Sequence, residues 1–384
     1  MVPRTVVESL ADELIEVIAD EDPLLATMNG IREWDTELAD LSEEADGGLR
    51  GRAAAVATRA RELDDATLSA DDRVTRAVAQ EQAEAVCHRI DSRAVEYTVS
   101  NHFVAPAARV IHYLPRVPIA DGEQANAYLC RLGQLRGYLS TAAHRHAGGT
   151  VAGRLPVGRL VRGAISQLDR AVALGDDDPL LGPLRHDGME RYAEQGMRLL
   201  ETEIRPAFAR YRAVLGEIAP SARGDDQPGL CWITGGESIY ANLIRVHTDS
   251  GHSPNVLHRT GKGLVNELRT EIEHCDAMRA VRLVVDTGLH AEGWSRSRAV
   301  DYMRANTAMP DVEIEAEVDR YIAMPGQALA STVGRMEITR IRTTRRGTRR
   351  VRGWYTTPET MGTPPDREQV NRREPTPARN EDVR

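Results

Sequence analysis

Polar residues repeat at intervals of four in the otherwise apolar segment RLVVDTGLH, residues 282–290. Arg282, Asp286 and His290 would therefore lie on one face of a single helix, one turn apart. There Asp286 could accept a hydrogen bond from Arg282 and orient the imidazole of His290. We take these three as candidate catalytic residues, although such a row more often forms a structural ion-pair ladder.

Short turns and caps after this row predict further helices. Ser295 is a good N-cap for a helix ending near Asn306, and more helices are predicted after Pro310 and over 327–341. Periodicity predicts the other helices over 5–19, 52–63, 69–93, 122–145, 156–174, 184–218 with a kink near Pro206, 236–246 and 254–274. We expect an irregular loop over 101–118 and a helix break at Gly148-Gly149.

The composition fits helices that pack closely through small side chains. Aromatic residues make up 4% of the 384 residues, so the core must rest on Leu, Val, Ile and Ala. We therefore expect an all-α fold, an elongated array of many helices. The expected organisation is an N-terminal helical region over 1–223, a C-terminal helical region over 224–342 and a disordered tail over 343–384, which is rich in Arg and Pro.

The net charge and the pattern of apolar residues limit the possible partners and the cellular location. A net charge of -9 argues against nucleic acid as the main partner, and no stretch is apolar enough to span a membrane. The N-terminus has no signal-peptide pattern, and Cys87, Cys130, Cys231 and Cys275 have no CxxC pairing. We expect reduced thiols and a cytoplasmic location; the oligomeric state stays open.

Several motifs resemble the bacterial DUF885 family. They are VVDTGLHAEGW, RAVDYMRANTA and EAEVDRYIAMPGQALA, with GLCWITGGESIYANLIRVHTDSGHSPNVLHRTGKG upstream of them. The resemblance covers most of residues 1–342 and implies an all-helical, zinc-dependent peptidase of the gluzincin type. It also implies that Tyr240 and His247 lie near a substrate cleft, and we add Trp294 and Tyr321 as candidate substrate contacts.

The sequence departs from the family pattern where the zinc ligands should be. Family members carry an HExxPGHH-type segment between the two histidine-containing helices, but here residues 273–276 run almost directly from one to the other. No His in the chain is followed by Glu, and Glu271 and His274 form a lone E-x-x-H unit. We therefore assign no metal ligand and no cofactor, although the family implies zinc.

These observations leave three functional hypotheses. The first is a catalytically inactive member that retains part of a peptide-binding cleft; Ser331, where the family usually has tyrosine, agrees with it. The second is an active zinc peptidase whose ligands are rearranged among His247, His258, His274 and His290. The third is a helical interaction scaffold that uses the acidic N-terminal region or the arginine-rich tail. Whether the protein is an enzyme is left open.

Overall fold

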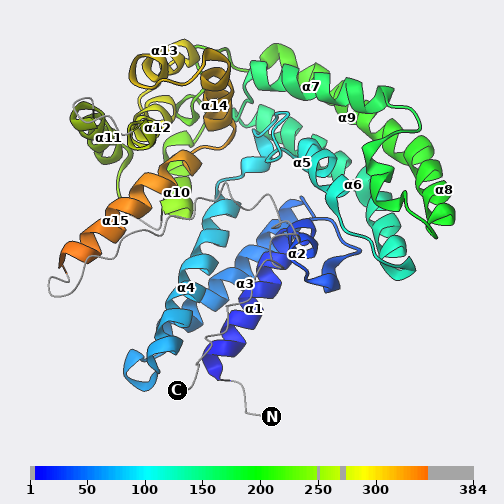
Figure 1. The fold of residues 1–384 in the computed structure, drawn as a ribbon, viewed down its shortest axis with the longest axis horizontal. Coiled ribbons are helices and arrows are strands. Elements are labelled where there is room, and N and C mark those ends of the chain that lie inside the picture. The colour runs from blue at the N-terminus through cyan, green and yellow to red at the C-terminus, as the bar shows by residue number, and fades with distance from the viewer. Residues whose placement is uncertain (1–4, 249–250, 269–273, 345–384) are drawn as a thin grey trace, which may run out of the picture. The chain divides into compact units, whose positions relative to one another are not determined.

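The computed structural model describes residues 5–248, 251–268 and 274–344. These residues form fifteen α-helices joined by short 3₁₀ and π turns, and the only β pairing among them is a single bridge between Val157 and Arg223. The predicted all-α fold is confirmed (Figure 1). The chain divides into two units, Met1–Met336 and Glu337–Arg384, and the predicted disordered tail lies almost wholly outside the described residues.

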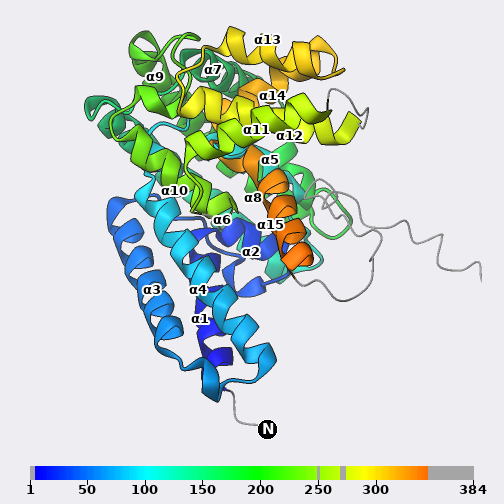
Figure 2. The ribbon, with the colours of Figure 1, turned by 90° about the vertical axis from the view of Figure 1, so that its left-hand side faces the viewer.

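Three long helices of the N-terminal region lie side by side (Figures 1 and 2). The helices of this region are α1 (Val6–Glu21), α2 (Pro23–Met28), α3 (Glu43–Glu62) and α4 (Ala70–Asp91). Their shared core contains many alanines, such as Ala57, Ala60 and Ala83, which let the helix backbones approach closely. Helix α3 begins nine residues before the predicted start at 52, because Ser42 caps it by accepting from the Ala45 N–H at 3.1 Å.

The middle of the chain packs around α6. Its helices are α5 (Pro106–Tyr113), α6 (Gly122–Val151), α7 (Gly158–Ala173), α8 (Glu190–Leu199) and α9 (Arg205–Ile218). A π turn, Leu200–Ile204, precedes Pro206, at the place where the sequence predicted a kink. These helices share one large apolar core, which includes Leu132, Leu139 and Phe208.

Two predictions about this region are wrong. The expected irregular loop over 101–118 contains helix α5, which starts with Pro106 at a position where a helix needs no N–H donor. The expected break at Gly148-Gly149 is absent, since α6 continues to Val151. The left-handed residue that ends this segment is Gly153, with φ of 75°.

The C-terminal region is built around α12. Its helices are α10 (Gly236–Thr248), α11 (Pro254–Leu268), α12 (His274–His290), α13 (Arg296–Asn306), α14 (Asp311–Ala323) and α15 (Ala330–Thr344). The predicted cap of α13 is confirmed, because the Ser295 hydroxyl accepts from the Arg298 N–H at 3.2 Å. Val281, Val284 and Val285 of α12 are fully buried, so this helix forms the centre of the region.

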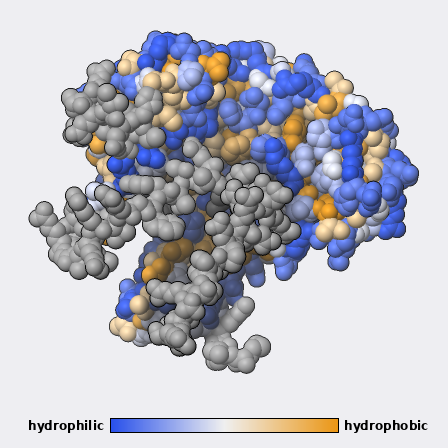
Figure 3. Space-filling view, viewed as in Figure 1, coloured by the Kyte–Doolittle hydropathy of each residue, from blue (hydrophilic) through white to orange (hydrophobic). Residues whose placement is uncertain are grey.

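In the coloured part of the face in Figure 3, hydrophilic residues predominate and apolar ones gather in small patches. Among the described residues, no helix combines the length and the apolar character needed to span a bilayer.

Candidate functional site

Asp286 is completely buried and binds groups far from it in sequence. Its carboxylate accepts from the Tyr240 hydroxyl of α10 at 2.6 Å and from the Gly326 N–H at 3.1 Å. Burial raises the pKa of Asp286 to about 7, although the hydrogen bonds from Tyr240 and Gly326 act to lower it. The carboxylate thus ties α10 and the Pro325-Gly326 turn to α12.

His290 is held by two main-chain groups. Its Nδ1 accepts from the Leu230 N–H at 3.1 Å, and its Nε2 lies 3.0 Å from the Tyr321 carbonyl oxygen. A neutral imidazole with the proton on Nε2 satisfies both contacts, and burial lowers the pKa of His290 to about 3. Both ring nitrogens are engaged, so the main chain orients this ring in place of Asp286.

Close approach of the backbone makes the Leu230 contact possible. A Cβ atom at Gly229 would lie 1.7 Å from the Leu289 carbonyl oxygen, so only glycine fits between this turn and the end of α12. The ring of Tyr240 then covers His290, with centroids 5.2 Å apart.

Arg282, the third residue of the predicted row, pairs with α14. Its guanidinium lies 3.4 Å from a carboxylate oxygen of Glu317. That same carboxylate accepts from Arg320 at 2.7 Å and from the Tyr321 hydroxyl at 2.7 Å. The three candidate catalytic residues therefore bind different groups: Asp286 holds α10 and the Pro325-Gly326 turn, His290 holds the Leu230 turn and α14, and Arg282 also holds α14.

Three of the four candidate substrate contacts are core residues. Tyr240 and Tyr321 are completely buried, and Trp294 is 3% exposed, packed between His258 and Tyr302. The fourth, His247, is partly exposed and lines a cavity. Burial and the nearby Arg89 lower the pKa of His247 to about 4, so this imidazole is neutral at pH 7.

The cavity lined by His247, which we call the α4–α10 pocket, has a volume of about 370 Å³. Its wall comes from the end of α1, the start of α3 and the segment before it, the end of α4 and the residues after it, α10 and the turn after α14. Its apolar lining includes Leu41, Leu49, Ile90, Leu243 and Met324, and its polar lining includes Glu21, Asp46, Arg89, Arg93 and His247. A mainly apolar cavity with a few converging polar groups is the usual form of a small-ligand site.

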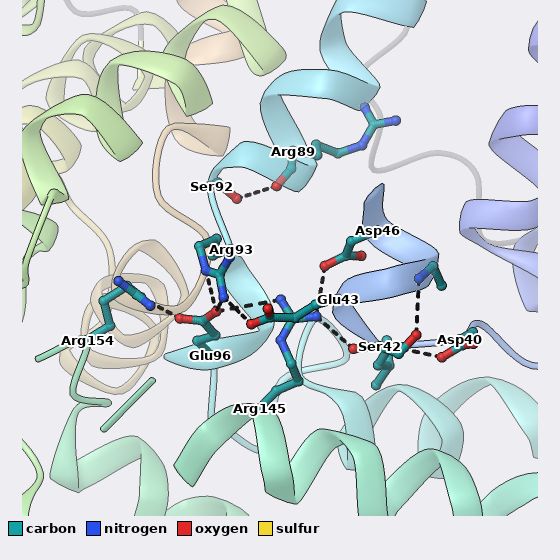
Figure 4. A network of polar contacts seen from close by, with 12 residues as sticks. Asp40, Ser42, Glu43, Asp46, Arg89, Ser92, Arg93, Glu96, Arg145 and Arg154 are labelled. Atoms are coloured by element: carbon teal, nitrogen blue, oxygen red, sulfur yellow. Dashed lines mark hydrogen bonds and ion pairs between the residues drawn. The ribbon is translucent and has the colours of Figure 1, made fainter. Parts of the chain in front are cut away.

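A network of charges centred on the buried Glu96 (Figure 4) shares Arg93 and Asp46 with this pocket. Glu96 is 2% exposed and binds Arg93 and Arg154, while Arg145 lies 3.7 Å from it. Arg145 also donates to Asp46 at 2.8 Å and to the Leu41 carbonyl oxygen at 2.7 Å. The network therefore connects the start of α3, α6 and the segments that follow α4 and α6.

Two unusual backbone positions shape the network. Arg93 has φ of 50°, the only left-handed residue other than glycine in the described part of the chain. Such a conformation is costly for a side chain with a Cβ and often marks a functional position. On α6, a Cβ atom at Gly149 would lie 2.6 Å from the Cβ of Glu96, so this glycine lets the two segments touch.

Sequence reasoning did not find the network or the pocket. One signal was present, because Arg131 and Arg145 stand on the buried face of α6 together with Leu132, Leu135 and Leu139. A charged residue on an apolar stripe indicates a buried ion pair or hydrogen-bond network. The partners of that charge come from distant segments and have no local pattern.

The described residues do not fit the zinc that the resemblance implied. No group of three His, Cys, Asp or Glu among them comes together to hold a metal ion. Of the expected alternative ligands, His290 is held by the main chain and Nδ1 of His258 lies 2.7 Å from the Thr287 hydroxyl. Glu271, the first residue of the E-x-x-H unit, lies outside the described residues.

Comparison with known proteins gives a family and a fold. The profile of a family described as "Bacterial protein of unknown function (DUF885)" matches residues 23–277 and 274–351. No curated protein matches the sequence.

Two solved structures are similar. One, from Colwellia psychrerythraea and described as a lipoprotein, has a TM-score of 0.74 and 15% identity over 88% of this chain and 92% of its own. The other, a protein of unknown function from Shewanella oneidensis also described as a lipoprotein, has a TM-score of 0.53 and 12% identity over 74% of this chain and 53% of its own. At these identities the likeness shows a shared fold.

Proposed function

Since this chain belongs to the DUF885 family of bacterial proteins of unknown function, we propose that it is a non-hydrolytic relative of zinc-dependent peptidases that binds a short peptide in the α4–α10 pocket. The observation that carries the proposal is the pocket itself. It combines an apolar wall with the neutral His247 and the charged Arg89 and Arg93, which suits a ligand with apolar side chains and a polar backbone.

The contacts of the predicted catalytic row support the absence of hydrolysis. Asp286 and His290 are buried and hydrogen-bonded to segments of their own chain, so neither presents a free atom to a substrate or a water. A general base must reach the proton that it removes. In this chain Asp286 acts as a positioning residue, because it holds α10 and the Pro325-Gly326 turn, which both contribute to the pocket wall. His290 holds the Leu230 turn and α14.

The form of the family match supports an internal deletion. The profile matches in two segments that meet at 274–277, next to the place where the sequence lacks the HExxPGHH-type segment. Part of this junction, residues 269–273, lies outside the described residues. Deletion of the segment that supplies the zinc ligands would leave the binding surface without its chemistry.

A cytoplasmic location is part of the proposal. Cys87, Cys130 and Cys231 are free thiols in the structure, as expected for a reducing compartment. Fractionation of the source cells, with immunodetection of the native protein, tests this point. Recovery in the membrane fraction would contradict it.

Peptide binding without cleavage is the test of the function. We expect the full chain to bind a fluorescently labelled apolar tripeptide saturably, and to leave a mixed tetrapeptide set intact by mass spectrometry with or without added Zn²⁺. Met324→Trp should block binding because Met324 lines the pocket, whereas Met309→Trp, outside it, should not. Cleavage that a chelator abolishes, or equal binding by the two variants, would overturn the proposal.

A further inference from the structure

The guanidinium of Arg93 has two carboxylate partners in different surroundings. Glu96 is buried, whereas the side chain of Glu43, the first residue of α3, is 65% exposed. Arg93 itself lines the α4–α10 pocket, with 39% of its side chain exposed. Exposed ion pairs contribute little net stability, so Glu43 can leave Arg93 for water at small cost.

The buried end of this network carries more positive than negative charge. Arg93, Arg145 and Arg154 surround the single buried carboxylate of Glu96 (Figure 4). The other carboxylates of the network come from the start of α3 and are more exposed. Three guanidinium groups around one buried carboxylate favour a further anion on Arg93, which lines the pocket and is now paired with Glu43.

The rest of the pocket surface determines the chemistry and size of the remainder of the ligand. Leu41, Leu49, Leu243 and Met324 offer an apolar wall. The volume of about 370 Å³ lies near the lower end of the ~300–1,000 Å³ that small-ligand pockets span. A group of this size with one anionic end would use both surfaces.

We propose that the α4–α10 pocket takes a carboxylic acid with an apolar body, whose carboxylate binds Arg93 in place of Glu43. The inference rests on the proposed function and names the chemistry of its ligand. The C-terminus of an apolar peptide and a medium-chain fatty acid share this chemistry. The exchange keeps Arg93 paired, and the planar guanidinium suits a carboxylate through two parallel hydrogen bonds.

Matched acid and neutral probes test the carboxylate. Calorimetric titration of the full chain would compare octanoate with octanol, and N-acetyl-Leu-Leu with its C-terminal amide. We expect an acid that binds to do so at least about tenfold more tightly than its neutral counterpart. The probe pair with the higher affinity shows whether the ligand is a fatty acid or a peptide C-terminus. Equal affinity of acid and neutral probes would overturn the carboxylate site yet keep the pocket. No binding by any probe would overturn the proposed function as well.

Two variants test the exchange of partners. Glu43→Gln removes the competing carboxylate, so the acid should bind several-fold more tightly. Arg93→Asn removes the cation while tolerating the left-handed backbone, so the preference for acid over neutral probe should disappear. Glu203→Gln, which removes the exposed partner of Arg136, is the control and should change nothing.

Thermal melting would first establish that each variant is folded. An unchanged or weaker affinity of Glu43→Gln for the acid would overturn the exchange. So would an acid preference that persists in a folded Arg93→Asn variant.

Discussion

Two buried titratable side chains on α12 have pKa values shifted in opposite directions. Burial raises the pKa of Asp286 to about 7 and lowers that of His290 to about 3. In both cases burial disfavours the charged form, and hydrogen bonds from other segments offset it only in part. Because both groups hold distant segments against α12, their protonation is linked to the stability of the fold.

The native chain should lose stability as the pH rises because Asp286 ionises, and the Asp286→Asn variant should not show this loss. The folded state binds the Asp286 proton more tightly than the unfolded chain, so this stabilisation is fully present below pH about 4 and is lost as the pH rises through about 7. The loss is on the order of 4 kcal/mol across that window. Asparagine keeps an oxygen that can accept from Tyr240 and Gly326 but does not ionise.

Urea unfolding at several pH values measures this effect. The free energy of unfolding of the native chain should fall relative to that of the variant between about pH 4 and about pH 7 and level off above that range, and other groups cancel in the difference. Parallel pH profiles for the two proteins would contradict the prediction.

His290→Asn should instead change how the free energy of unfolding depends on pH in the acidic range. The folded pKa of His290 is lowered, so its stabilisation is fully present above pH about 6.5 and is lost as the pH falls toward 3. The stability difference between this variant and the native chain should therefore vary with pH below 6.5 and be constant above it. The same urea series measures it, and a difference that varied only above pH 7 would refute the assignment.

At the scale of elements, α6 shows how tertiary contact decides where a helix ends. Gly148 and Gly149 would weaken an isolated helix, yet α6 runs through both because Gly149 packs directly on Glu96. Gly148 faces open space. Two neighbouring glycines of one helix therefore differ in the reason for their presence.

Alanine at these two positions should act in opposite directions. Gly149→Ala should destabilise the protein by about 1–3 kcal/mol, since its Cβ would collide with the Cβ and carbonyl oxygen of Glu96. Gly148→Ala should stabilise it by about 0.5–1 kcal/mol through helix propensity. Urea midpoints measured side by side decide this; similar shifts in the same direction would mean that the contact at Glu96 does not matter.

At the scale of the whole molecule, the Glu96 network joins segments that are far apart in sequence. Within Met1–Met336 it links the start of α3 through Glu43 and Asp46, α6 through Arg145, and the segment after α6 through Arg154. The apolar cores of the N-terminal helices and of the α6 region are separate clusters. The network is therefore one of the features that couple these cores.

Glu96→Gln should cost far more stability than loss of a surface pair. Removing the one buried carboxylate takes away the partner of Arg154 and leaves Arg93 and Arg145 with only their more exposed carboxylate partners, Glu43 and Asp46, which should cost about 3–5 kcal/mol. Asp169→Asn breaks the exposed pair with Arg212 and should change the free energy of unfolding little. Far-UV circular dichroism and tryptophan fluorescence during urea unfolding would measure both variants, and equal costs would contradict the buried role of Glu96.

The sequence by itself determined most of the helices and the fold class. Periodicity and capping are local, so Ser295 as the cap of α13 and the apolar stripe of α14 could be predicted from neighbouring residues. Short α5 was missed because the aromatic residues and prolines around it give no clear helical period. The helix break at Gly148-Gly149 was predicted wrongly because helix propensity says nothing about which residues pack on a glycine.

Only the tertiary structure decided what the polar residues do. Asp286 meets Tyr240 and Gly326, 46 and 40 residues away, and His290 meets Leu230, 60 residues away. The spacing of four correctly indicated one helix face but could not say that this face is buried against other segments. The pocket and the charges around Glu96 arise in the same way, because their side chains come from elements that approach one another only after the apolar faces have packed.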